Sequence, residues 1–142
     1  MLSISSNRPS EKAAPRALRV LLVEDSPDNQ FLFRAFIKKT PWEMELAENG
    51  AIGVEKFQTG HYDLVIMDMQ MPVMDGYTAM RTIRQWEREQ GRAPTPIVAL
   101  TANSLQEMAE KSLAAGCNAY VTKPISRDQF VSLIRQYAER AR

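Results

Sequence analysis

Short apolar segments alternate with helix-like segments five times from Arg19 onward. Strands are predicted at 19–24, 43–47, 62–67, 96–101 and 118–122, and helices at 27–39, 50–58, 77–89, 105–114 and 127–140. Four strand segments are nearly continuous apolar runs, as expected for strands buried on both faces, whereas 43–47 alternates and predicts an edge strand. The pattern therefore predicts an α/β domain with a parallel sheet covered by helices on both faces.

The length and composition are those of a single domain with a substantial hydrophobic core. The chain has 142 residues, of which 44% are hydrophobic. Residues 1–17 are rich in Ser, Ala, Pro and basic residues and show no apolar period, so we expect a flexible tail there. The folded domain is expected to span residues 18–142.

Several functional classes are excluded by charge and composition. The net charge is +1, from 18 basic and 17 acidic residues. The sequence therefore lacks the excess of positive charge that is typical of proteins that bind nucleic acid or an anionic membrane. No apolar stretch has the length of a membrane span, and the N-terminus lacks the apolar region of a signal peptide. The only cysteine, Cys117, excludes an internal disulfide, and the only histidine, His61, removes most zinc sites. We expect a cytoplasmic protein.

Polar side chains stand where the apolar runs stop. Glu24 and Asp25 follow the first predicted strand, Asp68 the third, Thr101 the fourth and Lys123 the fifth. Ligands of open parallel sheets bind at the carboxyl ends of the strands, where these side chains would converge. Three carboxylates, a hydroxyl and an ammonium group predict a site for a divalent cation and a phosphoryl group. Alone, each residue could be a strand-end cap or a surface side chain.

The chemistry of this site follows from its charges. Asp25 and Asp68 can supply oxygen ligands to a hard cation such as Mg²⁺, with Glu24 holding a coordinated water or supporting the ligands. Asp68 is then placed to act as a nucleophile that becomes an aspartyl phosphate. Thr101 can donate a hydrogen bond to a phosphoryl oxygen, and Lys123 can supply a positive charge.

Four motifs around these residues resemble the receiver domain of two-component response regulators, and the resemblance covers roughly residues 18–140. The motifs are Leu22-Val23-Glu24-Asp25-Ser26, Met67-Asp68-Met69-Gln70-Met71-Pro72-Val73-Met74-Asp75-Gly76, Ala99-Leu100-Thr101-Ala102 and Gly116 with Ala119-Tyr120-Val121-Thr122-Lys123-Pro124. The resemblance implies a flavodoxin-like (βα)5 three-layer fold with strand order 2-1-3-4-5.

The resemblance also implies a role for each site residue. Asp68 would be the phosphoacceptor, and the metal ligands would be Asp25, Asp68 and the backbone carbonyl of Gln70, with Glu24 assisting. Thr101 and Tyr120 match the pair that switches on phosphorylation. The Lys123-Pro124 peptide bond would be cis. Gln70 and Asn103 occupy two positions that influence the lifetime of the phosphoryl group.

The implied function is a phosphorylatable switch of a two-component phosphorelay. A histidine kinase or histidine phosphotransfer protein would phosphorylate Asp68, and the surface of the fourth helix, fifth strand and fifth helix would change its partners. A single-domain regulator and the receiver of a hybrid sensor kinase both remain open. We expect no enzymatic activity beyond phosphorylation and autodephosphorylation of Asp68.

Two other functional classes are less consistent with these residues. An aspartate-dependent phosphohydrolase typically has an acid/base Asp two residues after the nucleophile, where this chain has Gln70. A scaffold that is never phosphorylated usually lacks site residues, and none is missing here.

The first predicted helix is more apolar than one buried stripe requires. Its apolar side chains are Phe31, Leu32, Phe33, Phe36 and Ile37. Either the helix is wedged between the sheet and the last helix, or one edge belongs to a surface that binds a helical partner. On the second interpretation, Phe33→Glu is expected to weaken docking while leaving the fold intact.

Overall fold

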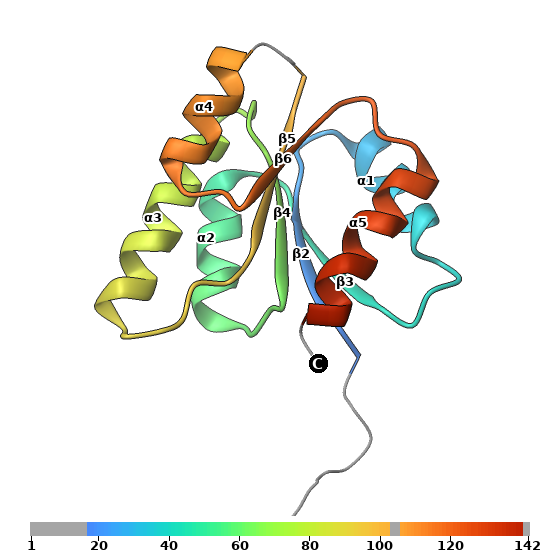
Figure 1. Ribbon diagram of the computed structural model, residues 1–142, viewed down its shortest axis with the longest axis horizontal. Coiled ribbons are helices and arrows are strands. Elements are labelled where there is room, and N and C mark those ends of the chain that lie inside the picture. Colours follow the sequence, from blue (N-terminus) through green and yellow to red (C-terminus); the bar gives the residue numbers. More distant parts are fainter. Residues whose placement is uncertain (1–16, 103–105, 141–142) are drawn as a thin grey trace, which may run out of the picture.

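A computed structural model describes residues 17–102 and 106–140 of the chain (Figure 1). Within these residues, five strands form one parallel sheet in the order β3-β2-β4-β5-β6. The strands are β2 (Arg19–Val23), β3 (Glu43–Ala47), β4 (Leu64–Asp68), β5 (Ile97–Thr101) and β6 (Ala119–Thr122). In chain order this arrangement is 2-1-3-4-5, which confirms the predicted topology. Strand β3 lies at one edge, as predicted.

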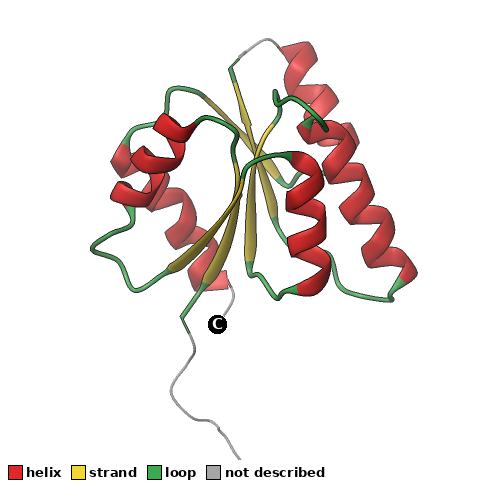
Figure 2. Ribbon diagram, turned by 180° about the vertical axis from the view of Figure 1, so that it is seen from behind, coloured by secondary structure: helices red, strands yellow, loops and turns green. Residues whose placement is uncertain are grey.

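Helices cover both faces of the sheet (Figures 1 and 2). One layer contains α1 (Pro27–Phe36) and α5 (Arg127–Arg140); the other contains α2 (Gly50–Thr59), α3 (Gly76–Glu89) and α4 (Gln106–Ala115). Successive residues of a strand point to opposite faces, so Leu21 packs into one hydrophobic cluster and Leu22 into the other. The three layers confirm the predicted fold class.

Side chains cap the helices where the sequence predicts. The Ser26 hydroxyl accepts a hydrogen bond from the Asn29 backbone N–H, and Pro27 is the first residue of α1. At the start of α5, Ser126 and Gln129 form the predicted reciprocal capping box. Ser104, the first residue of the box predicted at 104–107, and the variable residue Asn103 lie outside the described residues, as do residues 1–16 of the predicted tail.

Helix α1 ends three residues earlier than predicted. The α-helical hydrogen bonds stop at Phe36, and the Thr40 hydroxyl donates to the Ile37 carbonyl at 2.7 Å. Pro41 follows, and the residue before a proline is biased against helical conformation. Most other helix and strand boundaries agree with the prediction to within one residue.

The aromatic residues of α1 are divided between the core and the surface. Phe33 is 2% exposed, and its ring stacks on Phe130 of α5 with the centroids 4.8 Å apart. The expectation that Phe33→Glu leaves the fold intact is therefore wrong, because the change would bury a carboxylate between α1 and α5. Phe31 and Leu32, at 77% and 44% exposed, form the free edge of the helix.

None of the helices in residues 17–102 and 106–140 is long and apolar enough to cross a lipid bilayer. Cys117 is buried in the hydrophobic cluster beneath α2, α3 and α4, and this burial raises the pKa of its thiol. This placement agrees with a role in packing.

Candidate functional site

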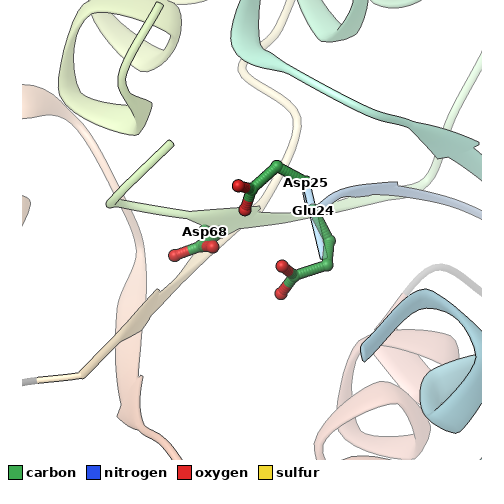
Figure 3. A group of neighbouring side chains, drawn as sticks. All are labelled: Glu24, Asp25 and Asp68. Atoms are coloured by element: carbon green, nitrogen blue, oxygen red, sulfur yellow. The ribbon is translucent and has the colours of Figure 1, made fainter. Parts of the chain in front are cut away.

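The carboxylates of Glu24, Asp25 and Asp68 meet at the carboxyl end of the sheet (Figure 3). One oxygen of each lies within 4.8 Å of the others. Asp68 ends β4, and the other two residues follow β2, which pairs with β4. Glu24 and Asp68 are 1% and 2% exposed, whereas Asp25 is half-buried. The site therefore joins two buried carboxylates to one that solvent can reach.

Lys123 brings a positive charge to the two buried carboxylates. Its ammonium nitrogen lies 3.2 Å from Asp68 Oδ2 and 3.5 Å from Glu24 Oε1. The Lys123-Pro124 peptide bond is cis, as expected. Thr101 is fully buried at the end of β5, one residue beyond the partner of Asp68 in the sheet, and its carbonyl accepts the Lys123 backbone N–H at 2.7 Å. The predicted convergence of strand ends is thus observed.

Glu24 is incompletely satisfied within the protein. Its Oε2 accepts the Ser26 N–H at 3.0 Å, but its buried Oε1 accepts no hydrogen bond from the described residues. Burial, together with repulsion from Asp68, raises the pKa of Glu24 despite the hydrogen bond from Ser26 and the nearby Lys123 ammonium. A buried carboxylate oxygen without a donor is costly, and a cation with its bound water would remove this cost. The donor set, all oxygen, suits a hard divalent cation.

The loop from β4 to α3 begins at the site and is tightly constrained. The Gln70 N–H donates to Asp68 Oδ1 at 3.1 Å, and the Gly76 N–H donates to the Met69 carbonyl at 3.2 Å. Between these points the Met74 N–H donates to the Pro72 carbonyl at 2.8 Å across Val73, whose φ is +71°. A hydrogen bond between residues two apart with a positive central φ defines a strained γ-turn. Sequence reasoning missed this turn, because valine strongly disfavours positive φ.

Two polar residues of α1 also hold Glu24, and the sequence analysis did not single them out. The Gln30 side-chain amide donates to the Glu24 carbonyl at 2.7 Å, and the Asn29 side chain acts to lower the pKa of the Glu24 carboxyl group. Both lie in the first turns of the helix that follows Glu24. Their position just after the N-cap is the signal that could have identified them.

The predicted switch residue Tyr120 lies on β6, opposite Ala99 of β5. Its side chain is 43% exposed. Tyr120 is thus at the surface of the outer strand, apart from the buried Thr101. The predicted position of Gln70 in the site is consistent with its hydrogen bond to Asp68. His61 is exposed before β4, at the opposite end of the sheet.

Comparison with known proteins identifies the family to which the chain belongs. The family model described as the response regulator receiver domain matches residues 20–135. The chain therefore belongs to the receiver domains of two-component systems, as the motifs imply. Over 131 residues it is 38% identical to the sensor histidine kinase GacS of Pseudomonas protegens, an alignment that covers 92% of this chain and 14% of the kinase. The chain thus spans a small part of the length of this kinase.

Two solved receiver domains are similar in structure. One is the Saccharomyces cerevisiae response regulator Ssk1, crystallised with the histidine phosphotransfer protein Ypd1; it is 35% identical, with a TM-score of 0.78 over 89% of this chain and 90% of that chain. The other is the receiver domain of the sensor histidine kinase PA1611 of Pseudomonas aeruginosa, with magnesium coordinated in its active site cleft. It is 36% identical, with a TM-score of 0.77 over 87% of this chain and 98% of that chain.

Proposed function

We propose that this receiver domain accepts a phosphoryl group on Asp68 and acts as a switch in a phosphorelay. The observation that carries the proposal is the position of Asp68, with the Lys123 ammonium at 3.2 Å and two further carboxylates nearby. A carboxylate between a cation site and an ammonium group can approach an anionic donor that would otherwise repel it.

Mg²⁺ would be held by the carboxylates of Asp25 and Asp68 and by the backbone carbonyl of Gln70, with Glu24 assisting. The unsatisfied Glu24 oxygen and the all-oxygen donor set support this assignment. Magnesium in the active site cleft of the Pseudomonas aeruginosa relative supports it further. When bound, the ion would neutralise charge on the transferred phosphoryl group.

The residues of the chain then have separate tasks. An Asp68 oxygen forms a bond to phosphorus while the bond from phosphorus to the donor's histidine nitrogen breaks. Lys123 and Thr101 bind phosphoryl oxygens, and Tyr120 turns inward as Thr101 moves. This movement shifts a pre-existing equilibrium of the surface formed by α4, β6 and α5. No substrate other than Asp68 itself is turned over.

Mass spectrometry tests the assignment directly. Incubation with Mg²⁺ and acetyl phosphate should add one phosphoryl group to the wild-type protein and none to Asp68→Asn. Asp28→Asn is the matched control, because Asp28 is an exposed carboxylate three residues after Asp25. Phosphorylation of Asp68→Asn would refute the proposal. Steady hydrolysis of phosphate esters would instead favour a phosphohydrolase.

The partner that we propose is a histidine kinase or a histidine phosphotransfer protein that docks on α1. The exposed Leu32 of α1 lines a mainly apolar hollow of about 330 Å³ that reaches Lys123 of the site. Its lining residues are Asn29, Leu32, Phe33, Lys123, Pro124 and Ile125. The Ssk1 receiver, crystallised with the phosphotransfer protein Ypd1, supports a partner of this class.

Phosphotransfer kinetics test this docking surface. Phe31→Glu should slow transfer from a phosphorylated histidine phosphotransfer protein while leaving phosphorylation by acetyl phosphate unchanged. Leu113→Glu, at an exposed leucine on α4, is the control and should not slow transfer. Equal transfer rates for both variants and wild type would remove α1 from the docking surface.

We further propose that residues 18–142 fold as one domain preceded by a flexible tail of residues 1–17, and that the protein works in the cytoplasm. The single-domain regulator and the hybrid-kinase receiver are both consistent with the relatives. Limited proteolysis should cut within residues 1–17 before it cuts the remainder of the chain. Cleavage that begins inside the sheet would contradict this organisation.

A further inference from the structure

Gly50, the first residue of α2, lies in unusually close contact with the loop from β4 to α3. A Cβ atom built on Gly50 would lie 2.4 Å from the Met74 carbonyl oxygen and 3.1 Å from its carbonyl carbon. Both neighbours are backbone atoms, so no side-chain rotation can relieve the contact. Any residue other than glycine would push the helix and the loop apart.

The contact itself, and not an unusual backbone conformation, explains the glycine. Gly50 has no positive φ, unlike Gly91 and Gly116. The helix start is also secured independently, because the Asn49 side chain accepts the Ile52 N–H at 2.8 Å. Alanine would be a good helix residue at this position if the loop were further away.

The loop that Gly50 touches is the one expected to supply the Gln70 carbonyl. Its ends are fixed by the hydrogen bonds of Gln70 to Asp68 and of Gly76 to Met69. If Met74 moves, the backbone of the loop between these two ends must change its conformation, and this part of the loop includes Gln70. Packing of Val73 does not hold the loop in place, because its side chain is 83% exposed. The backbone of Val73 is also strained already, at φ +71°.

We propose that Gly50 is a positioning residue for the metal site, which acts by letting α2 support this loop at backbone contact distance. The inference rests on the proposed Mg²⁺ site. The added methyl group of Gly50→Ala would shift Met74 and change the path of the backbone back to Gln70. The Gln70 carbonyl would then be misplaced relative to the carboxylates of Asp25 and Asp68.

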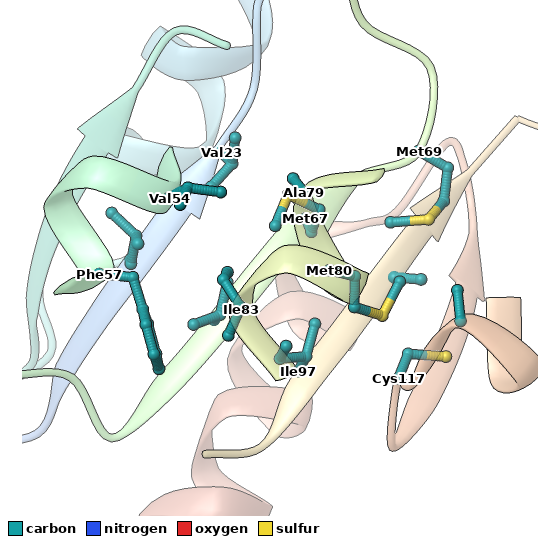
Figure 4. Close-up of a cluster of buried hydrophobic side chains, with 14 of the residues drawn as sticks. Val23, Val54, Phe57, Met67, Met69, Ala79, Met80, Ile83, Ile97 and Cys117 are labelled. Carbon is teal, nitrogen blue, oxygen red and sulfur yellow. The ribbon is translucent and has the colours of Figure 1, made fainter. Parts of the chain in front are cut away.

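Gly53 provides a matched control in the same helix. A Cβ atom there would lie 2.8 Å from a methyl group of Val23, which packs with Val54 in the core beneath α2 (Figure 4). Gly53→Ala thus adds the same methyl group with a similar clash. This clash is with a side chain of the core and does not involve the loop.

Mg²⁺ affinity measured by isothermal titration calorimetry, with stability measured by urea unfolding in Mg²⁺-free buffer, separates the two roles. Gly50→Ala should weaken Mg²⁺ binding about 10-fold, the scale at which supporting residues act on metal sites. Gly53→Ala should lose stability and bind Mg²⁺ like wild type. Equal affinity of Gly50→Ala and wild type, or an equal loss in both variants, would overturn the inference.

The outcome for the wild-type protein distinguishes this inference from the proposed function. Wild-type protein that binds no Mg²⁺ would refute the metal site itself.

A second variant is needed if Gly50→Ala does not fold. Val73→Gly relaxes the turn and gives the loop room to move away from the added methyl group. The double variant should then bind Mg²⁺ more weakly than Val73→Gly alone, and equal affinities would overturn the inference.

Discussion

Arg84 of α3 ties together the amino-terminal ends of β5 and β6. Its guanidinium donates to Glu87 Oε1 and the Thr95 carbonyl at 2.8 Å, and to the Gly116 carbonyl and Asn118 Oδ1 at 2.9 Å. The side chains of Arg84 and Glu87 are 12% and 3% exposed, so this ion pair is largely buried. The Thr95 N–H, at 2.7 Å, is the other donor to the Glu87 carboxylate.

Replacing Arg84 by Met should be strongly destabilising. The change leaves the Glu87 carboxylate buried with one backbone donor. The Thr95 and Gly116 carbonyls lose this donor, and Asn118 Oδ1 keeps only the Ile97 N–H. Breaking a buried ion pair by removing one partner costs about 3–5 kcal/mol. That loss is a large part of the roughly 5–15 kcal/mol that stabilises a typical domain. Met keeps much of the volume of the Arg stem, so little of the loss would come from a cavity.

Urea unfolding of single and double variants measures this effect. Arg84→Met/Glu87→Met should be less destabilised than the sum of the single variants, with a coupling of about 2 kcal/mol, because the double variant buries no unpaired charge. Arg81→Met on the exposed side of α3 is the control and should change stability by about 0.5 kcal/mol or less. If Arg84→Met costs no more than Arg81→Met, the buried pair does not stabilise the fold as argued.

Three further predictions test local features by urea unfolding. Val73→Gly should raise the free energy of unfolding by about 1 kcal/mol, because it removes strain at positive φ; a loss would contradict the strain. Asp75→Ala removes the N-cap of α3 and should cost about 1 kcal/mol. The Thr78 N–H lowers the pKa of Asp75, so this difference should be present above the ordinary pKa and vanish as pH falls through the folded value. Phe33→Ala should cost about 3–5 kcal/mol, whereas Phe31→Ala should have little effect; equal losses would contradict their observed burial.

The sequence predicts the sheet and the main site because both depend on strong, local signals. Apolar runs such as 64–67 have no stable place except between two layers of helices. Parallel pairing then brings the residues after each run to one edge, so Asp68 and Glu24 must lie close together. Their convergence needs no knowledge of side-chain packing.

Features that depend on packing between distant segments are not accessible in this way. On α1, the sequence shows too many apolar residues for one face but does not say which face is buried. Phe31 and Phe33 are two residues apart, so they point about 200° apart around the helix, and only the contact with Phe130 selects Phe33. The contact of Gly50 with Met74, and the hydrogen bonds of Arg84 to Thr95, Gly116 and Asn118, likewise join residues that no local pattern connects.

Two buried glutamates show how the two ends of the sheet differ in the compensation of buried charge. Glu24 and Glu87 are 1% and 2% exposed, so both must be compensated by neighbours. Glu87 is compensated on both oxygens, by Arg84 and by the Thr95 N–H. Glu24 keeps one oxygen without a hydrogen bond from the described residues, and burial raises its pKa. At the amino end of the sheet, the buried carboxylate of Glu87 is thus fully paired within the protein, which stabilises the fold. At the carboxyl end, a bound cation would compensate the carboxylate of Glu24, which links occupancy of the site to the free energy of the fold.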